Sequence, residues 1–297
     1  MIYNNILDTI GRTPMVKINK LNKKKGVNIY AKIEGVNPGG SIKDRIALKM
    51  LEQGEKEGKL NKEKIIIEAT SGNTGIALAM IGAARGYRVE IVMSAAVSPE
   101  RIKMIKAFGA EVILTDKTKG TDGAIMKVRE LAAENPDKYF NPNQFSNEYN
   151  KIAHYETTAR EIWRDMGGKI DYFTAALGTS GTLMGIGAYL KKKNPAVKIV
   201  SAEPVKEHYI QGLKNMEEAI VPEIYDCEKL DDVIMIDTEE AFRMARRIIA
   251  EEGIFVGMSS GAAMLATLKI AEKIDKGNIV TIFPDRGEKY LSTGLFT

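Results

Sequence analysis

Short runs of β-branched and apolar residues alternate along the chain with segments of helical periodicity. Some of these runs, such as 64–69 and 277–283, are apolar at successive positions. A strand with this pattern is buried on both faces, which is typical of parallel sheets covered by helices on two sides. The alternation therefore predicts an α/β protein with doubly wound, mostly parallel sheets.

The strands and helices that this pattern predicts cover most of the chain. The expected strands are 27–33, 64–69, 88–93, 110–115, 171–176, 197–202 and 277–283. The expected helices are 41–57, 74–85, 98–108, 120–134, 148–166, 181–192, 239–252 and 260–273. A polar stretch with prolines at 133–150 separates two groups of strands, and 297 residues are enough for two lobes.

The composition excludes several classes of protein. The formal net charge is only +4 and aromatic residues make up 7%, which does not favour a nucleic-acid-binding protein. The chain has two histidines and a single cysteine, Cys227, so neither a multi-histidine metal centre nor an internal disulfide is expected. The N-terminus lacks the pattern of a signal peptide, and no apolar stretch is long enough to span a membrane. These features predict a cytoplasmic protein without a metal.

A lysine lies in an unusual place in "NPGGSIKDRI" (37–46), because a cation at the start of a helix opposes the helix dipole. Lys43 could be an exposed charge, a phosphate ligand, half of an acyl-transfer pair with Ser41, or a covalent catalyst. The spacing does not match a Walker loop. The residues alone leave the other roles open.

Three further loops join a strand or turn to a helix. In "EATSGNTG" (68–75), glycines, hydroxyls and an amide form an anion-binding turn, although capping of the helix by Ser71 or Thr74 is an alternative. The dinucleotide pattern G-x-G-x-x-G is absent there. The loop "LGTSGTLMG" (177–185) would let the backbone approach a phosphate. In "FVGMSSGAA" (255–263), a serine cap of the following helix is the expected role.

Taken together, these loops resemble those of the cysteine synthase group of pyridoxal-phosphate enzymes, which have the tryptophan-synthase-β-like fold (fold type II). The motifs "IGRTPMV", "NPGGSIKDR", "TSGNTG", "NQFSNEYN", "GTSGT", "VGMSSGAA" and "PDRGEKYLST" occur in the order of that family. The resemblance covers essentially the whole chain. It implies two three-layer lobes, a larger one of residues 1–40 plus 146–297 and a smaller, mobile one of residues 41–145.

The resemblance assigns roles to individual residues. Lys43 would bind the aldehyde of pyridoxal 5'-phosphate as an internal aldimine and then act as a general base, Asn73 would hydrogen-bond the ring hydroxyl, and Ser259 would face the pyridine nitrogen. The residues expected to bind the cofactor phosphate are Gly178, Thr179, Ser180, Gly181 and Thr182. The residues expected to bind the substrate carboxylate are Thr70, Ser71, Thr74 and Gln144.

The implied activity is a β-replacement that makes L-cysteine from an activated serine, O-acetylserine first, and sulfide, by way of an aminoacrylate. An alternative is the same chemistry on cysteine, releasing hydrogen sulfide and making lanthionine or cystathionine. A third possibility is a binding protein that kept the fold without catalysis. The resemblance also implies a homodimer acting on small molecules, with neither nucleic acid nor membrane as a partner.

The chain departs from the usual family pattern in several places. Ala69 stands where proline is common and Ser180 where glycine is common. Residues 159–160 replace a common Gly-Pro, so the local helix start could differ. The stretch 210–226 resembles the cysteine synthase B branch. Within it, Lys214 lies near the position of an arginine in phosphoserine-using relatives, and a surface lysine on a mobile loop is an equal expectation.

Overall fold

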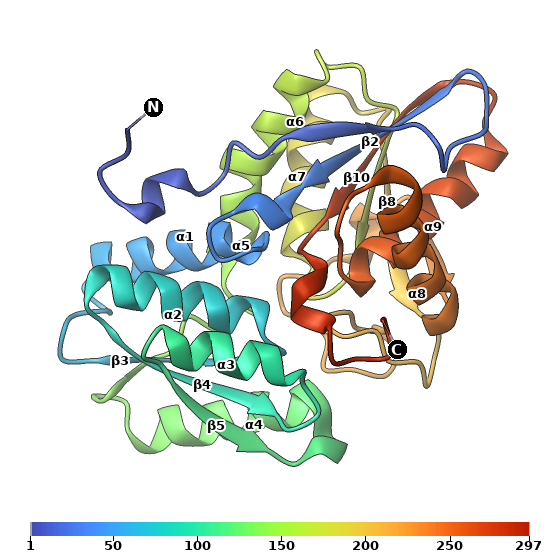
Figure 1. Cartoon of the computed structure of the whole chain (residues 1–297). Coiled ribbons are helices and arrows are strands. Elements are labelled where there is room, and N and C mark those ends of the chain that lie inside the picture. Colours follow the sequence, from blue (N-terminus) through green and yellow to red (C-terminus); the bar gives the residue numbers. More distant parts are fainter. Residues whose placement is uncertain (1, 297) are drawn as a thin grey trace.

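Two β-sheets organise the computed structural model, which describes residues 2–296 (Figure 1). The larger sheet has the strand order β1-β2-β10-β7-β8-β9, and the smaller sheet has the order β5-β4-β3-β6. The strands are β1 (Met15–Ile18), β2 (Val27–Ile33), β3 (Ile65–Ala69), β4 (Arg88–Ser94), β5 (Glu111–Thr115), β6 (Tyr139–Phe140), β7 (Tyr172–Ala176), β8 (Lys198–Pro204), β9 (Asp232–Ile236) and β10 (Gly277–Phe283).

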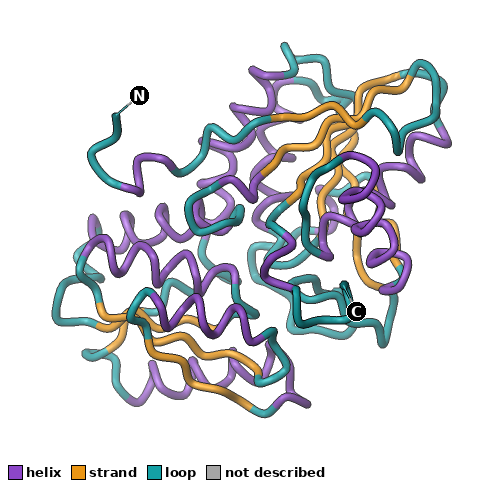
Figure 2. Tube along the Cα trace, viewed as in Figure 1, coloured by secondary structure: helices purple, strands orange, loops and turns teal. Residues whose placement is uncertain are grey.

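Helices cover both faces of each sheet (Figure 2). They are α1 (Lys43–Lys56), α2 (Asn73–Arg85), α3 (Pro99–Ala107), α4 (Gly120–Glu134), α5 (Glu148–Ala153), α6 (Ala159–Asp165), α7 (Gly181–Lys193), α8 (Thr238–Arg247) and α9 (Met258–Lys273). Consecutive strand residues belong to opposite layers of the core. Ile279 packs in the cluster that contains the α8 and α9 side chains, whereas Val280 packs in the cluster that contains those of α6 and α7.

The strands pair in parallel, except that β1 is antiparallel to β2 at the edge of the larger sheet. Strand β10 lies between β2 and β7, so the end of the chain returns beside its beginning. The loops after β2, β7 and β10 therefore leave the same edge of the larger sheet. In such sheets the carboxyl ends of the strands form the ligand-binding edge.

The structure contains every strand and helix that the sequence predicts, with small differences at the ends. It adds three strands that the periodicity did not predict, namely β1, β6 and β9. The helix predicted at 148–166 is divided by a π-helical turn at His154–Thr158, where the Thr157 hydroxyl donates to the Ala153 carbonyl at 2.6 Å. All strands of the smaller sheet lie between residues 65 and 140. The predicted movement of residues 41–145 as a unit stays a prediction.

Candidate active site

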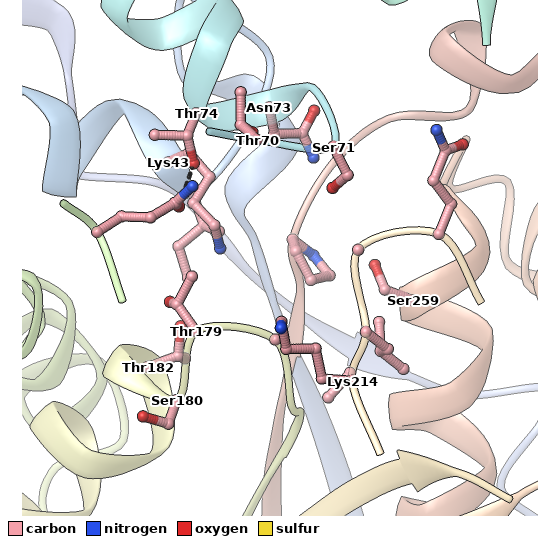
Figure 3. A pocket seen from close by; sticks show the side chains of 18 of the residues that line it. Lys43, Thr70, Ser71, Asn73, Thr74, Thr179, Ser180, Thr182, Lys214 and Ser259 are labelled. Atoms are coloured by element: carbon pink, nitrogen blue, oxygen red, sulfur yellow. Dashed lines mark hydrogen bonds between the residues drawn. The ribbon is translucent and has the colours of Figure 1, made fainter. Parts of the chain in front are cut away.

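A pocket lies where the carboxyl ends of the two sheets face each other. It gathers all the predicted site residues except Gly181, which begins the helix behind it: Lys43, Thr70, Ser71, Asn73, Thr74, Gln144, Gly178, Thr179, Ser180, Thr182 and Ser259. Figure 3 shows residues 70–74 opposite the 179–182 loop, with Lys43 beside them. Residues more than 200 positions apart in the sequence therefore share one pocket.

Lys43 is the first residue of α1, and it follows the turn made by the glycine pair. Burial lowers the pKa of its amine to about 8, although the negative charges of Asp285 and Glu34 oppose this shift. Its position at the helix N-terminus also disfavours the protonated form. Near neutral pH a substantial fraction of this amine is therefore uncharged and nucleophilic, unlike that of an exposed lysine.

The loop after β3 presents hydroxyls and backbone amides to the pocket. The Thr70 hydroxyl accepts from the Gly72 amide at 3.0 Å, which closes a tight turn before α2. Gly72 has φ of +143°, and a Cβ there would collide with the Arg101 side chain. The helix is preceded by Gly72 with no side-chain cap, so the alternative of a cap by Ser71 or Thr74 is wrong. This leaves the first amides of α2 available to an anion.

A buried hydrogen-bond network supports this loop from behind. The Thr74 hydroxyl donates to Gln144 Oε1 at 2.6 Å, and Gln144 Nε2 donates to the Ala69 carbonyl at 2.8 Å. The Glu68 carboxyl accepts from the backbone amides of Ala69 and Gln144 at 2.9 and 3.0 Å. Burial raises the pKa of Glu68 to about 8. The network fixes Gln144 beside the start of α2.

The loop after β7 is built on close backbone packing. A Cβ on Gly178 would lie 2.5 Å from the Gly212 carbonyl oxygen, and one on Gly181 would overlap the Asn150 side chain. Ser180 precedes α7 in a left-handed conformation with φ of +68°. Its buried hydroxyl has no partner among the described residues. An orphaned hydroxyl beside a helix N-terminus fits a phosphate, which accepts hydrogen bonds from such groups.

A buried histidine lies behind this loop. His154 Nε2 is 3.4 Å from the Thr182 hydroxyl, and Nδ1 is 3.0 Å from that of Thr158. Burial, with the charges of Lys43 and Arg45, holds the pKa of His154 well below its usual range. The ring is therefore neutral and supports the loop without adding charge. No motif in the sequence predicts a role for this residue.

Ser259 lines the pocket, but the prediction that a serine of its loop caps the following helix is wrong. Helix α9 begins at Met258 after Gly257, and no side chain caps it. Ser259 and Ser260 therefore lie inside the first turn rather than before it. The Ser259 hydroxyl faces the pocket (Figure 3), where it offers a neutral donor and acceptor.

The expectation that Lys214 is a surface lysine is also wrong. Its side chain is 8% exposed and lines the pocket. Its amine lies 2.8 Å from Asp122 Oδ1 at the start of α4, and it donates to the Ile220 carbonyl at 3.1 Å. Asp122 also accepts from the Ile220 amide at 3.0 Å. The segment around 210–220 is thus tied to α4, and the Lys214 charge is already paired.

Several groups that border the site are not predicted by the sequence motifs. Arg101 lines the pocket and donates to the Ser71 carbonyl at 2.7 Å. Asp285, Lys289 and Tyr290 come from the motif "PDRGEKYLST", which pointed to the family but assigned no role. The motif is visible in the sequence, but only the fold shows that Asp285 and Lys289 contact Asn73 and that Tyr290 contacts Asp285.

Other potential sites receive no support from residues 2–296. Within that range no cluster of three or more His, Cys, Asp or Glu side chains could hold a metal ion. Among the same residues, no helix has both the length and the apolar character needed to cross a membrane. Cys227 is an exposed free thiol and does not line the pocket.

Comparison with known proteins agrees with this geometry. The family described as "Pyridoxal-phosphate dependent enzyme" matches residues 6–285. The chain is 48% identical to a cysteine synthase of Aquifex aeolicus over 98% of its own length and 92% of the relative's. A cysteine synthase structure from Entamoeba histolytica has a TM-score of 0.93 at 46% identity, covering 100% of this chain and 91% of that one. A hydrogen sulfide-producing enzyme from Fusobacterium nucleatum has a TM-score of 0.93 at 46% identity, covering 98% and 100%.

Proposed function

The chain belongs to the family of pyridoxal-phosphate dependent enzymes, and on this basis we propose that it makes L-cysteine from an activated serine and sulfide. O-acetylserine is the first candidate for the activated serine. Membership of the family confirms the predicted cofactor, fold type and enzyme class. The main observation behind the proposal is that the buried amine of Lys43 and the N-termini of α2 and α7, which can both bind anions, line one pocket.

We propose that the two lobes hold different parts of the cofactor and substrate. The cofactor phosphate would be held at the start of α7, as the close packing there and the orphaned Ser180 hydroxyl support. The residues that would hold it are Gly178, Thr179, Ser180, Gly181 and Thr182. Lys43 would hold the cofactor through its aldehyde, and Asn73 would face the ring oxygen. When bound, the cofactor supplies an electron sink for the negative charge that develops at the substrate Cα.

Lys43 then acts as the base that removes the Cα proton. With a pKa of about 8, about a tenth of the free amine is neutral at pH 7, against less than about 0.1% for an unperturbed lysine. A base whose pKa lies near the working pH is the most effective proton acceptor. After the nucleophile has added at Cβ, the same ammonium can return the proton to Cα before the product leaves.

The substrate carboxylate is assigned to the start of α2, where Thr70, Ser71, Thr74 and Gln144 line the pocket. Free amides and the helix dipole favour an anion there. This site holds the carboxylate while Lys43 acts on the neighbouring Cα.

Ser259 is assigned to the pyridine nitrogen. A neutral hydroxyl does not hold that nitrogen protonated as a carboxylate would. Ser259 would therefore leave the bound cofactor a weaker electron sink, which would favour prompt loss of the β-substituent over transamination.

Closure of the pocket completes the proposed mechanism. We infer that residues 41–145 move towards the larger lobe over bound substrate and exclude water. The ion pair between Lys214 and Asp122 supports this inference, because it joins a loop of the larger lobe to α4 of the smaller lobe beside the pocket. Equal small-angle scattering with and without substrate would contradict closure.

The alternative activity uses cysteine as the substrate and releases hydrogen sulfide. The similarity to the Fusobacterium enzyme supports it. Both reactions need the same base, carboxylate site and cofactor. They differ only in the leaving group and the incoming nucleophile.

We also infer a cytoplasmic homodimer that acts on small molecules and binds neither nucleic acid nor membrane. The single cysteine is compatible with a reducing compartment. Exposed apolar side chains on the N-terminal segment, at Ile2, Ile6 and Val16, support a contact with a second copy. Light scattering of the purified protein would test the dimer, and a monomer at all concentrations would contradict it.

The activity is tested with purified protein loaded with pyridoxal 5'-phosphate. We expect fast cysteine formation from O-acetylserine plus sulfide and slower sulfide release from cysteine alone. Fast release from cysteine with negligible use of O-acetylserine would establish the alternative instead. A protein that stays colourless after addition of the cofactor would support a binding protein without catalysis.

A further inference from the structure

The segment from Pro284 to Tyr290 has no role in the mechanism above, yet it joins three loops of the site. The Ile42 amide donates to the Pro284 carbonyl at 2.9 Å, next to Lys43. Ser41 and Val256 form isolated β-bridges with Asp285 and Arg286, respectively. The end of β10 is therefore fixed between the lysine loop and the loop that precedes Ser259.

Two charged residues of this segment hold both ends of the Asn73 amide. Asn73 Nδ2 donates to Asp285 Oδ2 at 2.8 Å, and Asn73 Oδ1 accepts from Lys289 Nζ at 3.0 Å. A rotation of the amide by 180° would place oxygen against carboxylate and NH₂ against ammonium. The two charges thus determine which side of Asn73 is the donor.

Both charges are buried, with 1% of each residue exposed. Lys289 also donates to the carbonyls of Gly39 and Gly40 at 3.2 and 2.8 Å, and Asp285 accepts from the Tyr290 hydroxyl at 2.7 Å. Asp285 Oδ1 has no partner among the described residues. A buried pair of this kind contributes little net stability, because desolvation offsets attraction. Its placement against Asn73 therefore points to a role in the site.

Asp285 also acts on the lysine of the site. Its negative charge raises the pKa of Lys43 and is the larger of the two charge effects that oppose burial, the other being Glu34. The cations near Asp285 include Lys43, Lys289 and Arg101, whose guanidinium lies 3.8 Å from Oδ2, and the charges of Asp44 and Glu288 also act on Lys289. One carboxylate therefore links the Asn73 amide to the charge of Lys43.

We propose that Asp285 and Lys289 are positioning residues, which orient Asn73 as a hydrogen-bond donor to the cofactor ring and balance the charge at Lys43. This inference rests on the proposed function. Asn73 Nδ2 has two protons, and Asp285 accepts one of them. The second is left for the ring oxygen, so the site selects the ionised form of that oxygen.

The test uses Asp285→Asn, Lys289→Met and the control Glu288→Gln in the full chain loaded with pyridoxal 5'-phosphate. Glu288 lies on the same turn with a side chain that is 41% exposed, and Glu288→Gln removes the same charge as Asp285→Asn. The first readout is the pH midpoint of the visible absorption band of the loaded protein. The second is kcat, and thermal unfolding reports on the fold.

We expect Asp285→Asn to lower the pH midpoint by about one unit, because a negative charge near the lysine is lost. Lys289→Met should shift the midpoint in the opposite direction by less, since one of the two cations beside Asp285 is lost while Arg101 remains. Asp285→Asn and Lys289→Met should each lower kcat about tenfold. Glu288→Gln should change kcat and the midpoint far less, because Glu288 is half-exposed and pairs with Arg286 rather than with Asn73. A general loss of structure would not move the two midpoints in opposite directions.

Wild-type midpoints in both variants would overturn the proposal, as would shifts in the same direction. If Asp285→Asn does not fold, an unchanged midpoint in folded Lys289→Met overturns it alone. The wild-type protein tests the proposed function separately: a wild type that binds the cofactor but turns over no amino acid refutes that function and leaves the spectral test intact.

Discussion

The two sides of the pocket are built in different ways. On the larger lobe, the 178–182 loop relies on backbone packing, since neither Gly178 nor Gly181 has room for a side chain. On the smaller lobe, the start of α2 relies on side-chain hydrogen bonds that run from Thr74 through the Gln144 side chain to the Ala69 carbonyl. The Glu68 carboxyl accepts from the backbone amide of Gln144. A phosphate held permanently suits a rigid backbone cradle, whereas a substrate that enters and leaves suits an adjustable network.

Because of this difference, substitutions on the two sides should change different measured quantities. Changes in the larger lobe should act on binding of the cofactor, and changes in the smaller lobe should act on KM for the amino acid. Lys43 is linked to both sides, because it begins α1, which packs against α2, and because its pKa responds to the charge of Asp285 just after β10.

The largest effect is expected for Lys43→Ala. Loss of the base and of the covalent attachment should lower kcat by at least about a thousandfold, with the fold retained. Steady-state kinetics and circular dichroism would measure this. Lys49→Ala, on the same helix but paired with Glu156 at the surface, should keep nearly full activity. Retained turnover in Lys43→Ala would refute the assigned role.

A methyl group on the rigid side should act on the cofactor. In Gly178→Ala the new Cβ would lie 2.5 Å from the Gly212 carbonyl oxygen, so the backbone must shift away from the phosphate. We expect the Kd for pyridoxal 5'-phosphate to rise about a hundredfold, measured by fluorescence titration. Gly294→Ala is the control, because its Cβ would be 3.9 Å from the Phe242 ring. An unchanged Kd in Gly178→Ala would contradict the backbone cradle.

Removal of one hydroxyl on the adjustable side should act on the substrate. Thr74→Val loses the donor to Gln144 Oε1, so KM for O-acetylserine should rise about twentyfold while the cofactor Kd is unchanged. Thr267→Val removes a buried hydroxyl that bonds Thr174 in the larger lobe, and it should lower stability without changing KM. Equal KM values in the two variants would remove the distinction between the sides.

The smallest effect concerns pH. Burial lowers the pKa of Lys43 to about 8, so the proposal that Lys43 is the base predicts that kcat rises as the pH increases through that value. Between pH 7 and 9 the rise should be about tenfold, followed by a plateau. A kcat that falls over this range would indicate that the protonated amine is the active form.

The sequence predicted the fold well where strands are largely buried on both faces, as in β3 and β10, whose bounds agree with the prediction to within one residue. It missed β1, β6 and β9, which lie at sheet edges and are short or partly exposed. An edge strand is covered less completely, so its apolar pattern is weaker.

Within the site, local motifs predicted the pocket residues that lie on loops before helices. They could not predict the pairing of Lys214 with Asp122, or that of Asn73 with Asp285 and Lys289, because these contacts depend on the packing of distant segments. The cap expected from Ser259 or Ser260 was wrong, since the helix begins before both of them. A hydroxyl signals a helix start but does not define its first residue.

The central claim is that Lys43 is the residue that binds the cofactor covalently. It is tested most directly by borohydride reduction of the loaded protein, followed by peptide mapping with mass spectrometry. We predict that the added cofactor mass is found on the peptide that contains Lys43 and is absent from those with Lys214 or Lys289. Attachment to either of those lysines, or no attachment to a protein that has bound the cofactor, would contradict the account.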